Sequence, residues 1–253
     1  MTTAPSSARW GERLWPGSAP RVVPDSLARI REEVVACARC PRLVEYRSRV
    51  ARERKRSYAS EEYWGRAVPG FGDPSARLVA VGLAPAAHGS NRTGRVFTGD
   101  RSAAFLVRAF HDAGYANQAT SDHRGDGLRY RDLYLTAAVR CVPPGNHPTP
   151  AERARCAPFL ERELRCLTET RAILALGGFA WDALRDVVPR VYGGTRPDVP
   201  FAHGACAPLG AGKPILWGSY HPSPQNTNTG KLTEPMLAQL LVRIRESYGG
   251  RPR

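Results

Sequence analysis

Four short apolar runs, each followed by a loop and a helix-forming segment, constrain the fold of this chain more than any other feature. The runs are Arg77–Leu83, Leu133–Val139, Ala172–Leu176 and Pro214–Tyr220. Continuous apolar runs are typical of strands buried on both faces, and strands that alternate with helices favour a parallel sheet between two helical layers. We therefore predict an α/β fold, a three-layer α/β/α sandwich around a central four-stranded parallel sheet.

The helices that follow these runs are expected at about residues 101–113, 150–168, 179–187 and 234–248. Thr149, with Pro150 and Glu152 after it, forms a capping-box pattern that marks one helix start. Two more helices are expected before the first strand: one from Ser26 to about Ala36 with Asp25 as its cap, and one from Pro41 towards Arg56.

A chain of 253 residues is long enough for one large domain, and no internal repeat is visible. We predict a flexible tail over residues 1–24, a single domain over 25–248 and a flexible end over 249–253. No apolar run has the length of a membrane span or of a signal peptide. We therefore expect no membrane partner and a cytoplasmic location. We also expect a monomer.

The chain is strongly basic, with a formal net charge of +14, and all but Lys55, Lys213 and Lys231 of its basic residues are arginines. Guanidinium groups match phosphate oxygens, so a nucleic acid is one candidate partner. The other interpretation is a compositional preference for arginine that keeps the surface soluble.

Four of the six cysteines suggest a thiolate site. Cys37 and Cys40 form a C-x2-C pair, whereas Cys141 follows a predicted strand and Cys156 lies on the next helix. Zinc and a [4Fe–4S] cluster both accept four thiolates. The second pair lacks the close spacing of structural zinc sites, which favours iron–sulfur; buried free thiols are the remaining alternative.

Polar residues gather where the predicted strands end. The loops 82–85, 140–147, 177–178 and 220–222 all follow carboxyl ends of strands. In open α/β sheets, ligands bind at this edge. Four residues in or near these loops are candidates for a site: Asp100, His221, Asn146 and Phe97. Each also has a purely structural interpretation. Asp100 can cap a helix, His221 can be a hydrogen-bonded residue at the sheet edge, Asn146 can form a turn and Phe97 can belong to the core.

The chain resembles family 5 (type B) of the uracil-DNA glycosylase superfamily. The resemblance covers about residues 27 to 246 and rests on the segments Cys37–Val44, Val68–Pro74, Gly82–Pro85, His88–Arg95, Phe97–Asp100, Leu135–Asn146 and Ser219–Gly230. It implies a DNA repair enzyme of the three-layer fold, acting at the nucleoid. It also implies a structural [4Fe–4S] cluster on Cys37, Cys40, Cys141 and Cys156.

With this resemblance, the candidate residues acquire roles in cutting a base from a flipped nucleotide. We expect Asp100 to orient water, His221 to donate to the departing base and Asn146 to hold water or a sugar phosphate. Phe97 is expected to stack on the base. The backbone of Gly82, Leu83 and Ala84 is expected to meet the edge of the base.

Two alanines depart from related patterns. Ala137 stands where the family 4 pattern has a base-reading asparagine, and Ala86 stands where family 5 usually has glycine. The first departure removes the amide that a strict uracil reader needs. The resemblance to family 5 implies a broader range of substrates, such as hypoxanthine beside uracil, and the methyl group of Ala86 predicts a narrower approach of the backbone to the base.

We therefore predict a monofunctional DNA glycosylase of base excision repair that leaves an abasic site, since none of the three lysines lies within a matching segment, where it could serve as a lyase nucleophile. The alternative is a non-enzymatic iron–sulfur or zinc protein that binds damaged DNA without releasing a base. A nucleotide-binding α/β enzyme is disfavoured, because neither glycine-rich phosphate pattern is present.

Overall fold

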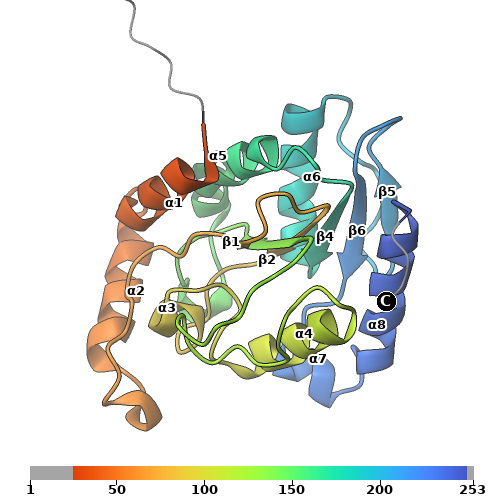
Figure 1. Cartoon of the computed structure of the whole chain (residues 1–253). Coiled ribbons are helices and arrows are strands. Elements are labelled where there is room, and N and C mark those ends of the chain that lie inside the picture. The colour runs from red at the N-terminus through yellow and green to blue at the C-terminus, as the bar shows by residue number, and fades with distance from the viewer. Residues whose placement is uncertain (1–24, 250–253) are drawn as a thin grey trace, which may run out of the picture.

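A computed structural model describes residues 25–249 of the chain (Figure 1). The tail predicted over residues 1–24, and residues 250–253 of the predicted C-terminal end, lie outside the described residues. Between them the chain forms an α/β structure with one mixed sheet. No helix within residues 25–249 has the length and apolar character needed to cross a membrane.

The centre of the sheet consists of four parallel strands, as predicted. They are β2 (Leu78–Gly82), β3 (Leu133–Ala137), β4 (Ala172–Leu176) and β6 (Ile215–Ser219), ordered β3-β2-β4-β6. Two short antiparallel strands, β1 (Phe71–Gly72) beside β3 and β5 (Cys206–Pro208) beside β6, extend the sheet to six strands. Side chains of the central strands are almost all buried, which explains their continuous apolar sequences.

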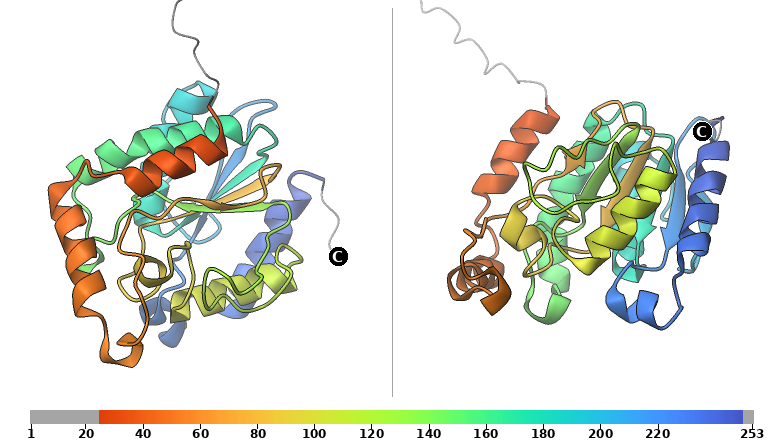
Figure 2. Two further views of the ribbon diagram at one scale, coloured as in Figure 1. Left: turned by 60° about the vertical axis from the view of Figure 1, so that its left-hand side comes forward. Right: turned by 60° about the horizontal axis from the view of Figure 1, so that its bottom comes forward.

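Helices cover both faces of the sheet (Figure 2). On one face, α4 (Arg101–Asp112) and α8 (Glu234–Glu246) pack against a set of strand residues that includes Leu78 and Leu174. On the other face, α5 (Pro150–Cys166) and α6 (Gly178–Tyr192) pack against the alternate residues, such as Val79 and Ile173. The three-layer prediction is therefore confirmed.

The two N-terminal helices form a separate corner of the core. Hydrophobic residues of α1 (Leu27–Ala36) and α2 (Pro41–Glu53) pack against Val139 and Phe159. The predicted cap of α1 was wrong: Ser26 accepts from the N–H of Arg29 at 3.2 Å, whereas Asp25 binds Arg162 at 2.7 Å. The chain leaves α2 at Glu53, because Arg54 adopts a positive φ of 51°, and a single 3-10 turn, η1 (Arg56–Tyr58), follows.

Short helical segments lie in the loops that follow the carboxyl ends of three strands. These are α3 (Ser90–Thr93) after β2, η2 (Pro144–Asn146) after β3 and α7 (Pro224–Asn228) after β6. The capping box at the start of α5 is present as predicted, with Thr149 and Glu152 bonded to each other's backbone. These loops form the edge on which the polar candidates gather.

Candidate active site

A small cavity of about 40 Å³ lies at the carboxyl edge of β2, β3 and β6. It brings together four predicted site residues, Asp100, His221, Phe97 and Ala84, with Ala137. The rest of the lining comes from Pro85, Ala86, Ser90, Val96 and Ser102. Segments that are more than 120 positions apart therefore meet at one site, as the placement of loops at strand ends predicted.

Asp100 is both a helix cap and a wall of this cavity. Its carboxylate accepts from the backbone N–H of Ala103, the third residue of α4, at 2.9 Å. Burial raises the pKa of Asp100, while the N–H groups of Ala103 and Ser102 and the charge of Arg92 oppose that shift. The structural and the functional interpretations of Asp100 are thus compatible, because the carboxylate that caps α4 also lines the cavity.

Gly89 makes room for the Asp100 carboxylate. A Cβ atom placed on Gly89 would lie 1.9 Å from Oδ2 of Asp100, a separation that no pair of unbonded atoms can adopt. The backbone just before α3 therefore lies directly against the carboxylate. Only glycine is compatible with this approach unless one of the two segments moves.

His221 comes shortly after β6, in the C-terminal part of the chain, and lines the same cavity as Asp100. Asn226 of α7 fixes its backbone by donating to the carbonyl oxygen at 2.8 Å. Burial lowers the pKa of His221 to about 4, so the imidazole is neutral near pH 7. Its ring nitrogens have no hydrogen-bonding partner within residues 25–249, which leaves an N–H available to a ligand.

Phe97 occupies the cavity in a strained backbone conformation. Its φ is 45°, a left-handed value that non-glycine residues adopt at a cost of about 1–3 kcal/mol. The ring lies 6.1 Å from that of His221, and a Cβ on Gly82 would come within 2.7 Å of it. Ser121 holds the loop by donating to the Phe97 carbonyl oxygen at 3.0 Å.

Three predicted site residues are absent from the lining of this cavity. Asn146 is exposed on η2 with a φ of 62°. The carbonyl oxygens of Gly82 and Leu83 accept from the N–H groups of Ala138 and Val139, at 2.9 and 3.0 Å. The roles of Asn146, Gly82 and Leu83 toward a substrate therefore stay predictions, while Ala84 does line the cavity.

Sequence reasoning missed the two serine hydroxyls of the cavity. Ser90 is only 4% exposed and lies on α3, and Ser102 lies in the first turn of α4. Serine in a loop or a first helical turn is common for purely local reasons, so no sequence pattern identified these two. The G-S-N-R-T-G-R segment of the resemblance was the one signal pointing to Ser90.

A wider hollow of about 650 Å³ adjoins the cavity and shares Asp100 with it. It is bordered by the segment after α2, by α3 and by the start of α4. Its polar lining consists of Tyr58, Glu61, Arg92, Arg101, Ser121, Asp122 and His123. Asp100 therefore lies between the narrow cavity and the wider, more open hollow.

The family model of the "Uracil DNA glycosylase superfamily" matches residues 69–245. The chain belongs to this superfamily. The match includes every strand of the sheet and both sides of the cavity.

Several relatives named "Type-5 uracil-DNA glycosylase" are similar over most of the chain. The protein of Mycobacterium tuberculosis is 48% identical over 226 residues, covering 88% of this chain and 82% of its own. That of Mycobacterium leprae is 50% identical over 214 residues, covering 84% and 91%. That of Thermus thermophilus is 49% identical over 218 residues, covering 86% and 96%.

The four cysteines singled out in the sequence lie together, and Ala84 of the cavity lining packs against the same cluster. Cys40, Cys141 and Cys156 belong to the core cluster of α1 and α2, and Cys37 packs against it. Burial raises the pKa of the Cys141 thiol to about 11, and buried Arg47 donates to its Sγ at 2.9 Å.

These donors suit soft metals and iron–sulfur clusters. No three His, Cys, Asp or Glu side chains within residues 25–249 are arranged around a point where one metal ion would fit. A [4Fe–4S] cluster requires cysteine sulfurs that are farther apart than the ligands of a single ion, because each thiolate binds a different iron. Cys166, the last residue of α5, packs against the same cluster, whereas Cys206 packs against another part of the core. Both remain structural residues in our interpretation.

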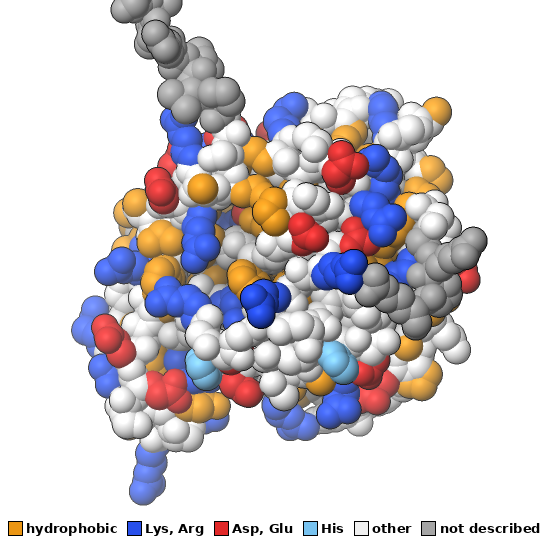
Figure 3. All heavy atoms as spheres, in the orientation of Figure 1, with side chains coloured by type: hydrophobic (Ala, Val, Ile, Leu, Met, Phe, Trp, Pro, Cys, Tyr) orange, Lys and Arg blue, Asp and Glu red, His pale blue; other side chains and the backbone are white. Residues whose placement is uncertain are grey.

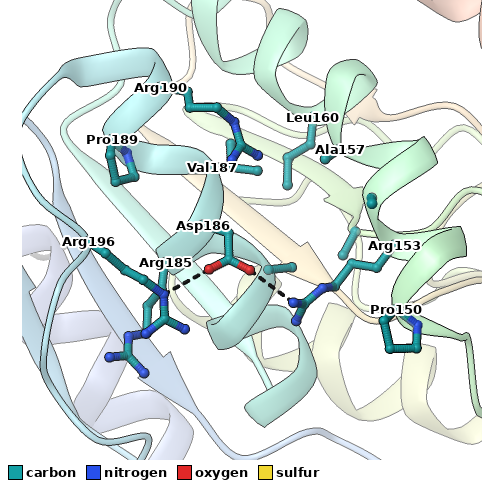
Figure 4. A pocket seen from close by; sticks show the side chains of 13 residues that line it. Pro150, Arg153, Ala157, Leu160, Arg185, Asp186, Val187, Pro189, Arg190 and Arg196 are labelled. Carbon is teal, nitrogen blue, oxygen red and sulfur yellow. Dashed lines mark hydrogen bonds and ion pairs between the residues drawn. The ribbon is translucent and has the colours of Figure 1, made fainter.

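A further hollow of about 450 Å³ lies between α5 and α6 (Figure 4). Four arginines line it, but its single carboxylate, Asp186, bridges Arg153 at 2.9 Å and Arg196 at 2.8 Å. The arrangement joins α5 to α6 and the following loop, with both oxygens of Asp186 engaged by arginines. We therefore interpret it as a structural contact between the two helices.

Proposed function

We propose that this protein removes uracil from DNA by hydrolysing the N-glycosidic bond of a flipped nucleotide, leaving an abasic site. The observation that carries the proposal is the meeting of Asp100 and neutral His221 in one small cavity beside Phe97. The names of the type-5 relatives support uracil as the base.

The two polar groups suit the two charges that develop during the reaction. Breaking the bond makes the sugar resemble an oxocarbenium ion and places negative charge on the base. Ionised Asp100 faces the cation and orients the attacking water. His221 donates its N–H to an oxygen of the departing base, and a neutral imidazole can do so at neutral pH without first gaining a proton.

The protein acts as a glycosylase alone. A lyase would need an amine that attacks the sugar carbon, and no lysine is among the described residues that line the cavity. Strand cleavage should therefore follow only from later treatment of the abasic site with alkali.

We further propose that bases other than uracil, such as hypoxanthine, are released. Ala137 offers a methyl group where an asparagine would read the uracil edge by paired hydrogen bonds, so that discrimination is lost here. The hydroxyls of Ser90 and Ser102 can each donate or accept, which suits more than one base edge.

A [4Fe–4S] cluster on Cys37, Cys40, Cys141 and Cys156 is the cofactor that we propose. Its chemistry would be structural, as four thiolate bonds that join the start of α2 to the end of β3 and to α5. Arg47 would hold one of these sulfurs by its hydrogen bond. Visible absorbance that disappears in Cys141→Ala and is kept in Cys206→Ala would support this assignment; zinc with a colourless protein would refute it.

DNA would lie across the cavity edge and reach the basic helix α2. Figure 3 shows basic side chains along the edge of the molecule formed by α2 and the segment after it. The exposed ones near the end of the helix are Arg49, Arg52, Arg54, Lys55 and Arg56. We propose that the protein acts on DNA as a monomer, because a single chain already brings Asp100 and His221 together in the cavity.

One set of assays tests the function. Duplex oligonucleotides containing uracil, hypoxanthine, xanthine or etheno-cytosine, with a thymine duplex as control, are incubated with the protein and analysed for abasic sites. We expect release of uracil and of hypoxanthine but not of thymine. Binding to uracil-containing DNA without release of any base would instead favour a non-enzymatic damage-binding protein.

A further inference from the structure

Arg92, in the last turn of α3, is a buried cation without a role in the reaction so far. Its side chain is 7% exposed. Nε donates to the carbonyl oxygen of His88 at 2.8 Å, and Nη2 donates to that of Gly99 at 2.9 Å. Nη1 pairs with Glu61, and the guanidinium carbon lies 4.0 Å from the centre of the Tyr58 ring.

These contacts join three segments around the residue that precedes Asp100. Gly99 has a φ of 78°, and a Cβ placed there would lie 2.4 Å from Nη2 of Arg92. The loop that carries Asp100 therefore rests directly on the guanidinium. On its other side, the carboxylate rests on Gly89, so Asp100 is fixed from both sides.

On the side away from Gly99, Arg92 contacts the segment that follows α2, which is basic. Tyr58 and Glu61, the partners of Arg92, come directly after the exposed Arg54, Lys55 and Arg56. A substrate phosphate that engages this segment would act on a part of the chain bonded to Arg92. Because both hydrogen bonds go to backbone oxygens, they fix the loop whichever base occupies the cavity.

We propose that Arg92 is a positioning residue for Asp100, holding the Gly99–Asp100 backbone and linking it, through Glu61 and Tyr58, to the basic segment that meets DNA. The inference rests on the proposed glycosylase function. A planar fork that reaches two carbonyls and a carboxylate together explains why arginine stands here, since lysine has a single donor nitrogen.

The charge of Arg92 also enters the pH dependence of the site. Burial is the largest influence on the pKa of Asp100 and raises it, whereas Arg92 lowers it. Removing this cation should move the acidic limb of the pH–rate profile to higher pH. The other charged or titratable groups that border Asp100 or the hollow beside it are Glu61, Arg101, Asp122, His123 and His221.

Three variants separate position from charge: Arg92→Met, Arg92→Lys and Glu61→Gln. Single-turnover release of uracil from duplex DNA is measured with saturating enzyme from pH 5 to 9, together with the Kd for a duplex carrying an uncleavable nucleotide. A misplaced catalytic group costs on the order of 10- to 100-fold in rate, which we expect for Arg92→Met with little change in Kd.

Lysine keeps the charge but not the fork, so Arg92→Lys should lose rate while the acidic limb stays in place. In Arg92→Met the limb should move to higher pH. Glu61→Gln, at a partly exposed side chain, should fold normally and lose a smaller part of the rate, and Glu62→Gln, a change of equal charge at the neighbouring exposed residue, should lose none.

Rates of uracil release unchanged in both Glu61→Gln and Arg92→Lys, or an acidic limb that does not move in Arg92→Met, would overturn the inference. A loss confined to Kd would also overturn it, because Arg92 would then contribute to binding alone. Absence of uracil release by the unchanged protein is a different result, which would remove the proposed function itself.

Discussion

The buried ion pair between Arg140 and Glu163 should be one of the most sensitive points of the fold. Their side chains are 1% and 2% exposed, and Nη2 of Arg140 lies 2.6 Å from Oε2 of Glu163. Glu163 also accepts from the hydroxyl of Thr136 at 2.8 Å. The pair joins the segment after β3, which carries Cys141, to α5.

Replacing Glu163 by alanine leaves the Arg140 guanidinium in the protein interior without its carboxylate. Removing one partner of a buried pair costs about 3–5 kcal/mol. Without Glu163, the guanidinium of Arg140 would keep only one hydrogen-bonding partner. Its Nε already lacks a partner, and Nη1 would still donate to the hydroxyl of Thr136. For a domain of this size we expect Tm to fall by about 2–4 °C for each kcal/mol lost.

Urea unfolding followed by circular dichroism measures the loss. The matched control is Glu169→Ala, which removes the surface pair with Arg171 at 3.3 Å and should cost about 0–1 kcal/mol. The double variant Arg140→Met with Glu163→Leu should regain much of the stability that Glu163→Ala loses, because no uncompensated charge remains. A cost for Glu163→Ala no larger than that of the control would refute the reasoning.

Three further predictions concern the cavity. Ala137→Asn should lower release of hypoxanthine more than release of uracil, measured on matched duplexes, because the new amide reads the uracil edge and fills space; an equal loss for both bases would contradict this. Gly89→Ala should keep the circular dichroism spectrum and lose most turnover, since the new Cβ would displace the Asp100 carboxylate; full activity would show that the approach is loose. Because burial lowers the pKa of His221 from 6.5 to about 4, its contribution to stability is fully present above about pH 6.5 and is lost as the pH falls towards about 4. His221→Asn should therefore flatten the dependence of unfolding free energy on pH in that window, and an unchanged slope would place the ring in water.

The parallel centre of the fold was predictable because each strand is buried on both faces and so reads as an uninterrupted apolar run. Ala172–Leu176 illustrates this, with both bounds as predicted. The edge strands β1 and β5 escaped because two or three residues are too few to show a pattern, and each includes a glycine or a proline.

The site was predictable in part for a similar reason. Asp100 immediately precedes a helix start and His221 comes just after a strand end, and both boundaries can be recognised in the sequence. Arg92 and Ser90 lie on a four-residue helix, α3, and Arg92 contacts Glu61, which is 31 positions away. No local sequence pattern indicates such a contact. Asn146 was placed at the same edge by sequence, but the left-handed turn on η2 leaves it exposed and outside the cavity lining.

The central claim is that Asp100 takes part in the chemistry and does not merely cap α4. Asp100→Asn preserves a side-chain oxygen that can accept from the N–H of Ala103, so the cap is retained while the charge is lost. The direct test is single-turnover release of uracil from duplex DNA, with Kd for the same duplex measured in parallel. We predict unchanged Kd and loss of most turnover; turnover equal to that of the unchanged protein would reduce Asp100 to a helix cap.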